Sequence, residues 1–136
     1  MAGPSVAGVL AQLQGEDWHY VGEASEPVFA SGWENAGTTS ALAYKITDAG
    51  TEVRVYGVIL DNGAADPNVC TLPAGYRPDS GRYGIITVSV LDSMGAYRGG
   101  VLVVADDGTV SVPATDSADT VIVNGSYPIT PPDVTP

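Results

Sequence analysis

From residue 18 onward the chain consists of short runs in which apolar and polar residues alternate, the period of a half-buried β-strand. Within residues 83–91, for example, Ile86, Val88 and Val90 alternate with polar Thr87 and Ser89. The same kind of pattern predicts further strands over 18–21, 41–47, 51–60, 96–105, 109–113 and 120–124, the last continuing into 127–129. Turn-forming residues separate these runs. The pattern therefore predicts an all-β protein of seven or eight short strands.

Two compact turns predict β-hairpins. Asp48-Ala49-Gly50 separates two strand-like runs, and Asp106-Asp107-Gly108 separates two others. A late glycine suits a tight hairpin because it readily adopts a positive φ, and Asp107-Gly108 is the stronger of the two signals. Gly99-Gly100, inside a predicted strand, indicates a bulge or a close backbone approach.

The strand expected over 51–60 is unusual because neither of its faces is fully polar. Val53 and Val55 share one face, whereas Tyr56 and Val58 lie on the other with Arg54. Apolar residues on both faces are typical of a strand that is covered on both sides. The second cover could be another sheet or another subunit.

The connector TLPAGYRP, residues 71–78, predicts a rigid corner between two strands. Pro73 and Pro78 lack a backbone N–H and interrupt a sheet ladder, whereas Gly75 accepts a positive φ. Tyr76 and Arg77 can cover neighbouring apolar surface, so we expect them to hold the fold or a subunit contact.

Residues 1–16 are predicted to form a short helix that begins after Ser5. Its apolar stripe has helical spacing and consists of Val6, Val9, Leu10 and Leu13. A helix this short needs a partner, either the chain's own sheet or copies of itself about a symmetry axis. Residues 17–130 would form the β domain, and the proline-rich residues 131–136 a flexible tail.

Composition excludes several classes of function. The net charge of −11 argues against nucleic acid and against an anionic membrane surface, and no apolar run is long enough for a transmembrane helix. The hydrophobic content of 44% is that of a chain with a packed core. Cys70 is the only cysteine, so we expect a buried thiol, with a bridge to another chain as the alternative.

No catalytic or cofactor motif is present. The single histidine, His19, lies between Trp18 and Tyr20, and with one cysteine it makes a zinc site implausible. No G-x-S-x-G elbow, P-loop or dinucleotide fingerprint occurs. Asp61 and Asp66 carry oxygen ligands, but their spacing does not match an EF-hand, so ordinary turn chemistry is favoured over calcium. We therefore expect neither an enzyme nor a metal or other cofactor.

A sugar-binding site would need an exposed aromatic ring with polar neighbours. The aromatic candidates are Trp33, Tyr83 and Tyr97, the last followed by Arg98. For Trp33, as for Phe29, packing in the core is the favoured role. The polar candidates come from the loop DNGAADPN and are Asp61, Asn62 and Asn68.

An ordered series of motifs resembles a known family. It starts with Pro27-Val28-Phe29, Gly32-Trp33 and Tyr44-Lys45, and it continues with VRVYGVI (53–59), TLPAGYRP and ADDGTVSV (105–112). The series resembles the β-rich C-terminal domains of tail fibres, minor tail proteins and receptor-binding proteins of tailed bacteriophages. LPxGYRP is its most specific part.

The resemblance implies an antiparallel, jelly-roll-like β-sandwich that assembles as a homotrimer in the virion and contacts the host surface, often its saccharides. The N-terminal end would then join other virion proteins. Trimer contacts would come from the N-terminal stripe and from Tyr56 and Val58. The alternatives are a structural capsid or tail decoration protein without receptor binding and, less favoured, a carbohydrate-active enzyme.

Overall fold

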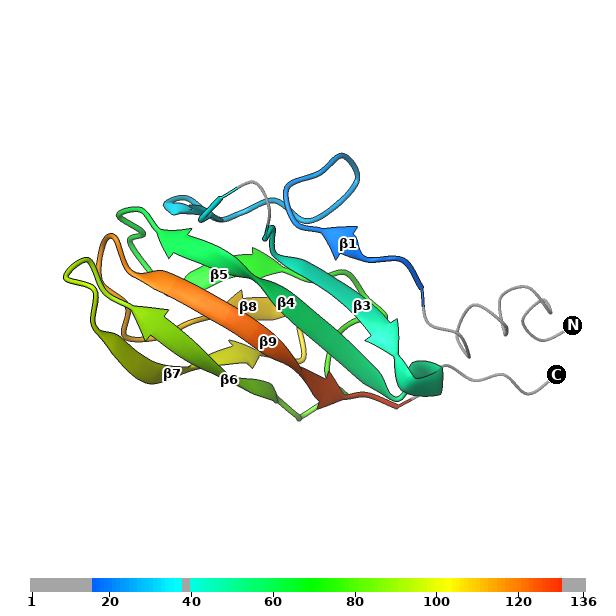
Figure 1. Cartoon of the computed structure of the whole chain (residues 1–136). Coiled ribbons are helices and arrows are strands. Elements are labelled where there is room, and N and C mark those ends of the chain that lie inside the picture. The colour runs from blue at the N-terminus through cyan, green and yellow to red at the C-terminus, as the bar shows by residue number, and fades with distance from the viewer. Residues whose placement is uncertain (1–15, 38–39, 131–136) are drawn as a thin grey trace, which may run out of the picture.

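The computed structural model describes residues 16–37 and 40–130, which fold into one antiparallel sheet (Figure 1). Its strands are β1 (His19–Tyr20), β2 (Trp33–Asn35), β3 (Ala43–Thr47), β4 (Glu52–Asp61), β5 (Asn68–Thr71), β6 (Gly84–Leu91), β7 (Tyr97–Val104), β8 (Thr109–Ser111) and β9 (Thr120–Pro128). The order across the sheet is β1-β3-β4-β9-β6-β7-β8-β5, and β2 also pairs with β4. The prediction of an all-β antiparallel protein is confirmed.

The sheet curls back on itself, so that β5 and β8 lie behind β4 and β9 in Figure 1. This differs from the predicted sandwich, which would consist of two separate sheets. The two layers are continuous here because β7 pairs with β6 in front and with β8 behind. The predicted hairpin at Asp106–Gly108 forms the turn between β7 and β8, with Ala105 N–H donating to the Thr109 carbonyl.

The core lies inside the curl. Ile86, Val88 and Val90 of β6 are buried, as the alternating pattern predicts, and Val53 and Val55 of β4 are buried opposite β9. The tightest part of the core consists of fully buried side chains, among them Tyr44, Tyr127, Leu42, Ile59, Leu102, Val69, Val104, Val112, Val121 and Val123. Burying apolar side chains of this size supplies most of the free energy of folding.

The segment between β1 and β2 links the two edges of the sheet. Ala30 N–H donates to the Val69 carbonyl at 2.7 Å, and the Trp33 indole N–H donates to the Asp66 carbonyl at 3.3 Å. Trp33 itself is only 4% exposed. Hydrogen bonds from this segment thus cover the edge of β5, which is the last strand of the sheet.

The connector TLPAGYRP holds the fold together, as predicted. Leu72 N–H donates to the Gly108 carbonyl, and Arg77 Nε donates to the Leu72 carbonyl. The Tyr127 hydroxyl donates to the Tyr76 carbonyl. The connector therefore fixes the β7–β8 turn and the end of β9 in place.

The predicted bulge in β7 is absent, and two other predicted segments cannot be compared with the structure. The predicted bulge at Gly99-Gly100 is wrong, because the β6–β7 register runs without a break. The close approach is present, since a Cβ on Gly100 would lie 3.2 Å from Val90 Cγ2. The predicted helix with Val6, Val9, Leu10 and Leu13, and the tail over 131–136, lie outside the described residues. In the described part of the chain no helix could span a membrane.

The described chain begins and ends at the same end of the sheet. Glu16 Oε1 accepts the Ile46 N–H on β3, and Ile129 N–H donates to the Thr51 carbonyl. Both contacts lie beside the turn of Asp48–Gly50 that joins β3 to β4. The loops after β4, β6 and β8 leave the sheet at the opposite end.

Gly84, the first residue of β6, faces the ring of Tyr127. A Cβ at Gly84 would lie 2.5 Å from the Tyr127 Cγ atom, which is closer than real contacts allow. Gly84→Ala is therefore expected to lower the free energy of unfolding by about 1–3 kcal/mol through overpacking. Urea denaturation measures this change.

The matched control is Gly99→Ala in β7, where a Cβ meets nothing within 4 Å. It should change the free energy of unfolding by no more than about 0.5 kcal/mol. Equal losses in the two variants would contradict the packing argument.

Candidate functional site

Three loops form what we call the distal loop end: residues 62–67, 92–96 and 112–119 (left in Figure 1). They meet because Leu60, Leu91 and Thr120 lie in register on neighbouring strands. Loops that a rigid sheet positions in this way are common places for binding residues.

A buried carboxylate, Asp61, joins two of these loops. It is 3% exposed, and it accepts hydrogen bonds from the Thr115 hydroxyl at 2.7 Å and from the Ala64 N–H at 2.9 Å. The Asp61 backbone also bonds to Ala118 and Asp119. A buried carboxylate is stable only when its oxygens are hydrogen-bonded. Asp61 therefore fixes the distal loops from beneath rather than presenting a surface group.

Asp119 and Arg98 form a second link. Arg98 Nη2 lies 2.7 Å from Asp119 Oδ2 and also donates to the Ala114 carbonyl at 2.9 Å. Burial of Asp119 opposes its charged form, but the Asp116 N–H and the Arg98 guanidinium outweigh this, so the pKa of Asp119 is lowered. Asp119 therefore stays ionised at neutral pH and holds loop 112–119 against β7.

A polar groove of about 230 Å³ lies between the loops. Its rim includes Asp66 and Thr115, and its remaining wall comes from Ala64, Pro67 and Pro113 among others. No group of three or more His, Cys, Asp or Glu side chains within 16–37 and 40–130 could hold a metal ion. The groove offers hydrogen-bonding groups and a small apolar wall, the mixture that a small polar ligand needs.

The structure brings together only some of the residues proposed for a sugar site. Asn62 and Asn68 are exposed at the distal loop end, as is Tyr97 at 67%, although none of the three lines the polar groove. Arg98 is directed at Asp119. Tyr83 is equally exposed but lies at the other end of β6, because Gly84 pairs with Val104 and Leu91 with Tyr97.

Trp33 and Asp61, also proposed as ligand contacts, are buried within the fold. The Trp33 indole N–H is bonded to the Asp66 carbonyl. Asp61 lines the polar groove, and both of its carboxylate oxygens are bonded to the loops around it. The burial of Trp33 confirms the core packing favoured for it, whereas the sequence pattern carried no signal for the burial of Asp61.

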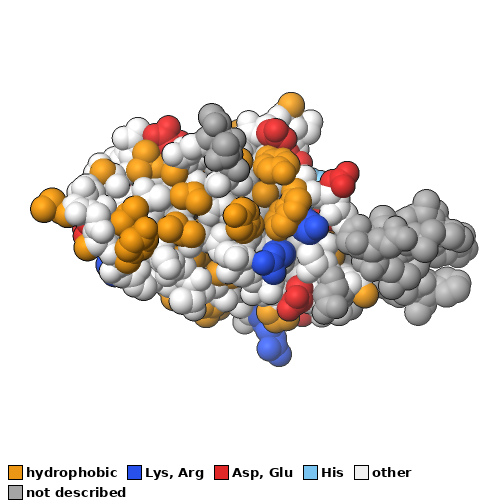
Figure 2. Space-filling view, in the orientation of Figure 1, with side chains coloured by type: hydrophobic (Ala, Val, Ile, Leu, Met, Phe, Trp, Pro, Cys, Tyr) orange, Lys and Arg blue, Asp and Glu red, His pale blue; other side chains and the backbone are white. Residues whose placement is uncertain are grey.

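The outer face of the sheet carries an apolar patch on β4 and β9, next to the polar side chains of Lys45, Arg54 and Asn124. Tyr56 is 46% exposed on this face, and Val58 pairs there with Ile122, itself 36% exposed. Figure 2 shows hydrophobic side chains gathered on this face next to basic ones. An open groove of about 330 Å³ adjoins Tyr56 and is lined also by Trp18 and Tyr20.

Trp18 and Tyr20 belong to this outer face, which the sequence pattern did not predict. The Trp18 and Tyr56 rings are 6.4 Å apart, and Lys45 Nζ lies 4.8 Å from the centre of the Trp18 ring. Their position depends on the pairing of β1 with β3, which sets Tyr20 opposite Ala43. Long-range pairing of so short a strand has no local signal.

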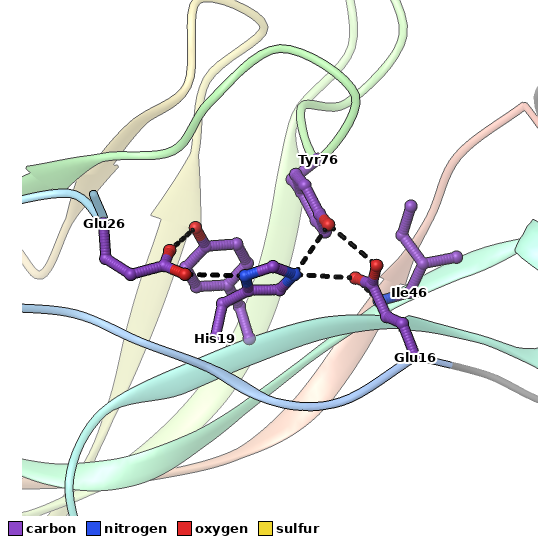
Figure 3. A network of polar contacts seen from close by, with 6 residues as sticks. Glu16, His19, Glu26, Ile46 and Tyr76 are labelled. Atoms are coloured by element: carbon purple, nitrogen blue, oxygen red, sulfur yellow. Dashed lines mark hydrogen bonds and ion pairs between the residues drawn. The ribbon is translucent and has the colours of Figure 1, made fainter. Parts of the chain in front are cut away.

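A polar and aromatic network surrounds His19 (Figure 3). Its Nδ1 lies 2.7 Å from Glu26, which also accepts the Tyr44 hydroxyl at 2.6 Å. Its Nε2 lies 2.9 Å from the Tyr76 hydroxyl, and that hydroxyl donates to Glu16 at 2.9 Å. The network ties β1 to β3 and to the TLPAGYRP connector.

The imidazolium form of His19 fits this network best, because both ring nitrogens can then donate. Burial of His19 disfavours the charge, but the hydrogen bond to Glu26 and the carboxylates of Glu16 and Glu26 outweigh it, so its pKa is raised. Glu26 accepts hydrogen bonds from Tyr44 and His19, and these lower the pKa of its carboxyl by more than burial raises it. Burial raises the pKa of Tyr44 and of Tyr76 far above neutrality, so neither phenol is a nucleophile at pH 7.

Together these features define the class of the molecule: a curled antiparallel all-β domain whose ordered polar loops lie opposite the end where the described chain begins and finishes. The fold is similar to that of the receptor binding protein (gp15) of Listeria phage PSA, with a TM-score of 0.60 over 93% of this chain and 81% of that chain. Sequence identity is 12%, so the likeness concerns the fold. No protein-family model and no curated protein sequence matches the chain.

The raised pKa of His19 predicts a pH-dependent stability. A raised pKa in the folded state stabilises the fold below the ordinary histidine pKa, and this contribution is lost as the pH rises through the folded value. The difference in unfolding free energy between the native chain and His19→Gln should therefore be largest near pH 5.5 and shrink toward pH 8.5. Urea denaturation across this range measures it.

The control is Tyr20→Gln, which alters the same strand without removing a group that titrates in this range. Its stability difference should stay constant. A difference for His19→Gln that is flat or that grows with pH would contradict the role of the imidazolium.

Proposed function

We propose that this chain is a host-recognition domain of a bacteriophage virion that contacts the host cell surface through its distal loop end. The observation that carries the proposal is the fold likeness to a phage receptor binding protein, which extends over 93% of the chain. The order of the motifs from Pro27 to Val112 supports the same class.

The arrangement of the chain supports the orientation of this domain. The described chain begins and finishes beside the turn of Asp48–Gly50, where the rest of a virion would be attached. The distal loop end then faces outward. Its loops are held by Asp61, Arg98 and Asp119, so exposed side chains there are positioned before a ligand arrives, which lowers the entropic cost of binding.

A neutral saccharide is the ligand class that we propose for this end. Tyr97 supplies an exposed ring, and Asn62, Asn68, Asp66 and Thr115 supply hydrogen-bonding groups. A chain with a net charge of −11 repels anionic ligands but not neutral ones. This is the mixture of stacking surface and polar groups that recognises sugar hydroxyls.

Cell binding tests the proposal. The purified protein should bind cells of at least one strain in a panel of bacteria and compete with a phage that adsorbs to that strain. Tyr97→Ala should weaken binding about tenfold, equivalent to about 1.4 kcal/mol. Flow cytometry with the labelled protein measures it.

The control is Tyr83→Ala, because Tyr83 has the same exposure of 67% at the other end of β6. It should bind as the native chain does. Equal losses in the two variants, or no binding to any strain, would overturn the distal site. Labelling of phage heads rather than tails by an antibody to the protein would instead favour a capsid decoration protein.

We further propose that the outer face around Tyr56 and Val58 is the contact of a homotrimer. Apolar side chains gathered on one exposed sheet face are typical of an interaction surface. Sedimentation velocity at micromolar concentration should show a trimer, and Val58→Glu should convert it to a monomer. Met94→Glu in the loop 92–96, where the side chain is 90% exposed, is the control and should leave the trimer intact. A stable native monomer would contradict this assembly.

A further inference from the structure

Strand β7 is paired unequally on its two sides. On one side it pairs with β6 along its whole length, from Tyr97–Leu91 to Val104–Gly84. On the other side β8 pairs only with Val103 and Val104. In the described part of the chain, the remaining edge of β7 from Tyr97 to Leu102 therefore has no neighbouring strand.

The register shows which backbone groups face this edge. Ala105 N–H donates to Thr109 on the β8 side, whereas the Ala96 carbonyl accepts from Asp92 on the β6 side. In an antiparallel ladder, alternate residues direct both their N–H and C=O to the same side. Tyr97, Gly99 and Val101 therefore direct their backbone groups to the open edge.

An apolar groove of about 470 Å³ runs along this edge. Val101 and Thr87 border it on the outer side of the sheet, and Pro113 and Ala114 border it on the loop side. A Cβ on Gly99 would meet nothing within 4 Å, so the outer face of the strand is open at this position. The groove has room for an added strand beside the open backbone groups.

The usual protections of an edge strand are missing here. Residues 97–102, YRGGVL, contain no proline and no lysine, two residue types that natural sheets place on exposed edges. Arg98 is held by Asp119 and by the Ala114 carbonyl and does not guard the edge. This combination is typical of edges that accept a strand from another chain.

The charges near the edge indicate what kind of segment fits. Arg98 forms an ion pair with Asp119, and the negative charges of Asp116 and Asp92 also attract its guanidinium. Carboxylates therefore outnumber basic groups at this end of β7. The net charge of the whole chain is −11. A segment with an acidic residue beside Tyr97 is therefore disfavoured at this edge, whereas one with a basic residue there gains attraction.

We propose that the edge of β7 from Tyr97 to Val101 binds an extended, uncharged-to-basic polypeptide segment of a partner protein as an additional strand. The segment forms backbone hydrogen bonds with Tyr97, Gly99 and Val101 and places small apolar side chains in the groove. The edge lies on the other side of Pro113 and Ala114 from the polar groove. The inference does not rest on the proposed saccharide site.

The probe is a synthetic peptide of alternating threonine and valine with a lysine at each end, labelled with a fluorophore. Fluorescence anisotropy should show saturable binding to the native chain. Amide hydrogen exchange in the complex should slow at Tyr97, Gly99 and Val101, while Arg98 and Gly100, already directed at β6, should change little.

Val101→Pro removes one outward N–H, a change that an edge position tolerates, and should weaken peptide binding at least tenfold. Val101→Thr keeps the N–H and is the matched control. A peptide with glutamate in place of both lysines should also bind at least tenfold more weakly. If Val101→Pro does not fold, the proposal is tested by the amide hydrogen exchange of the native chain with and without the peptide.

Three results would overturn the inference: no saturable binding, slowed exchange confined to other residues, or slowed exchange at Tyr97, Gly99 and Val101 through self-association in the absence of peptide. Tyr97→Ala, which weakens host binding in the other experiment, keeps the backbone groups of the edge and should retain peptide binding within about threefold. The two proposals can therefore fail separately.

Discussion

The antiparallel ladder between β4 and β9 is the constraint on which the rest of the structure depends. It runs from Glu52 opposite Pro128 to Leu60 opposite Thr120 and joins segments far apart in the chain. Its register turns Val53 and Val55 inward and leaves Tyr56 and Val58 on the outer face. A slip of one residue would exchange these two sets, because side chains alternate across a strand.

The same ladder separates the two ends of the domain. At one end the described chain begins and finishes, close to the His19 network that fastens β1 to the connector. At the other end Asp61 and Asp119 hold loops that would otherwise have little to pack against. Hydrogen-bonded carboxylates thus provide local order where the apolar core does not reach.

The exposed surfaces of the domain differ in physical character. The outer face carries an apolar patch around Tyr56 and Val58, the distal loop end is polar, and the β7 edge offers backbone groups beside an apolar groove. Each kind of surface favours a different kind of partner. One small domain of this kind could therefore assemble and bind through separate contacts.

The sequence by itself determined most of the strands, the hairpins at Asp48–Gly50 and Asp106–Gly108, and the structural role of Tyr76 and Arg77. These follow from alternation and turn chemistry, which act between near neighbours. The sequence pattern missed β2 and β5, which are short and lie in stretches predicted to be loops. Only the tertiary structure decided that Asp61 is buried, that Tyr83 and Tyr97 lie at opposite ends, and that Trp18 reaches Tyr56. These facts depend on the register between strands distant in sequence and on the curl of the sheet, for which a local pattern carries no signal.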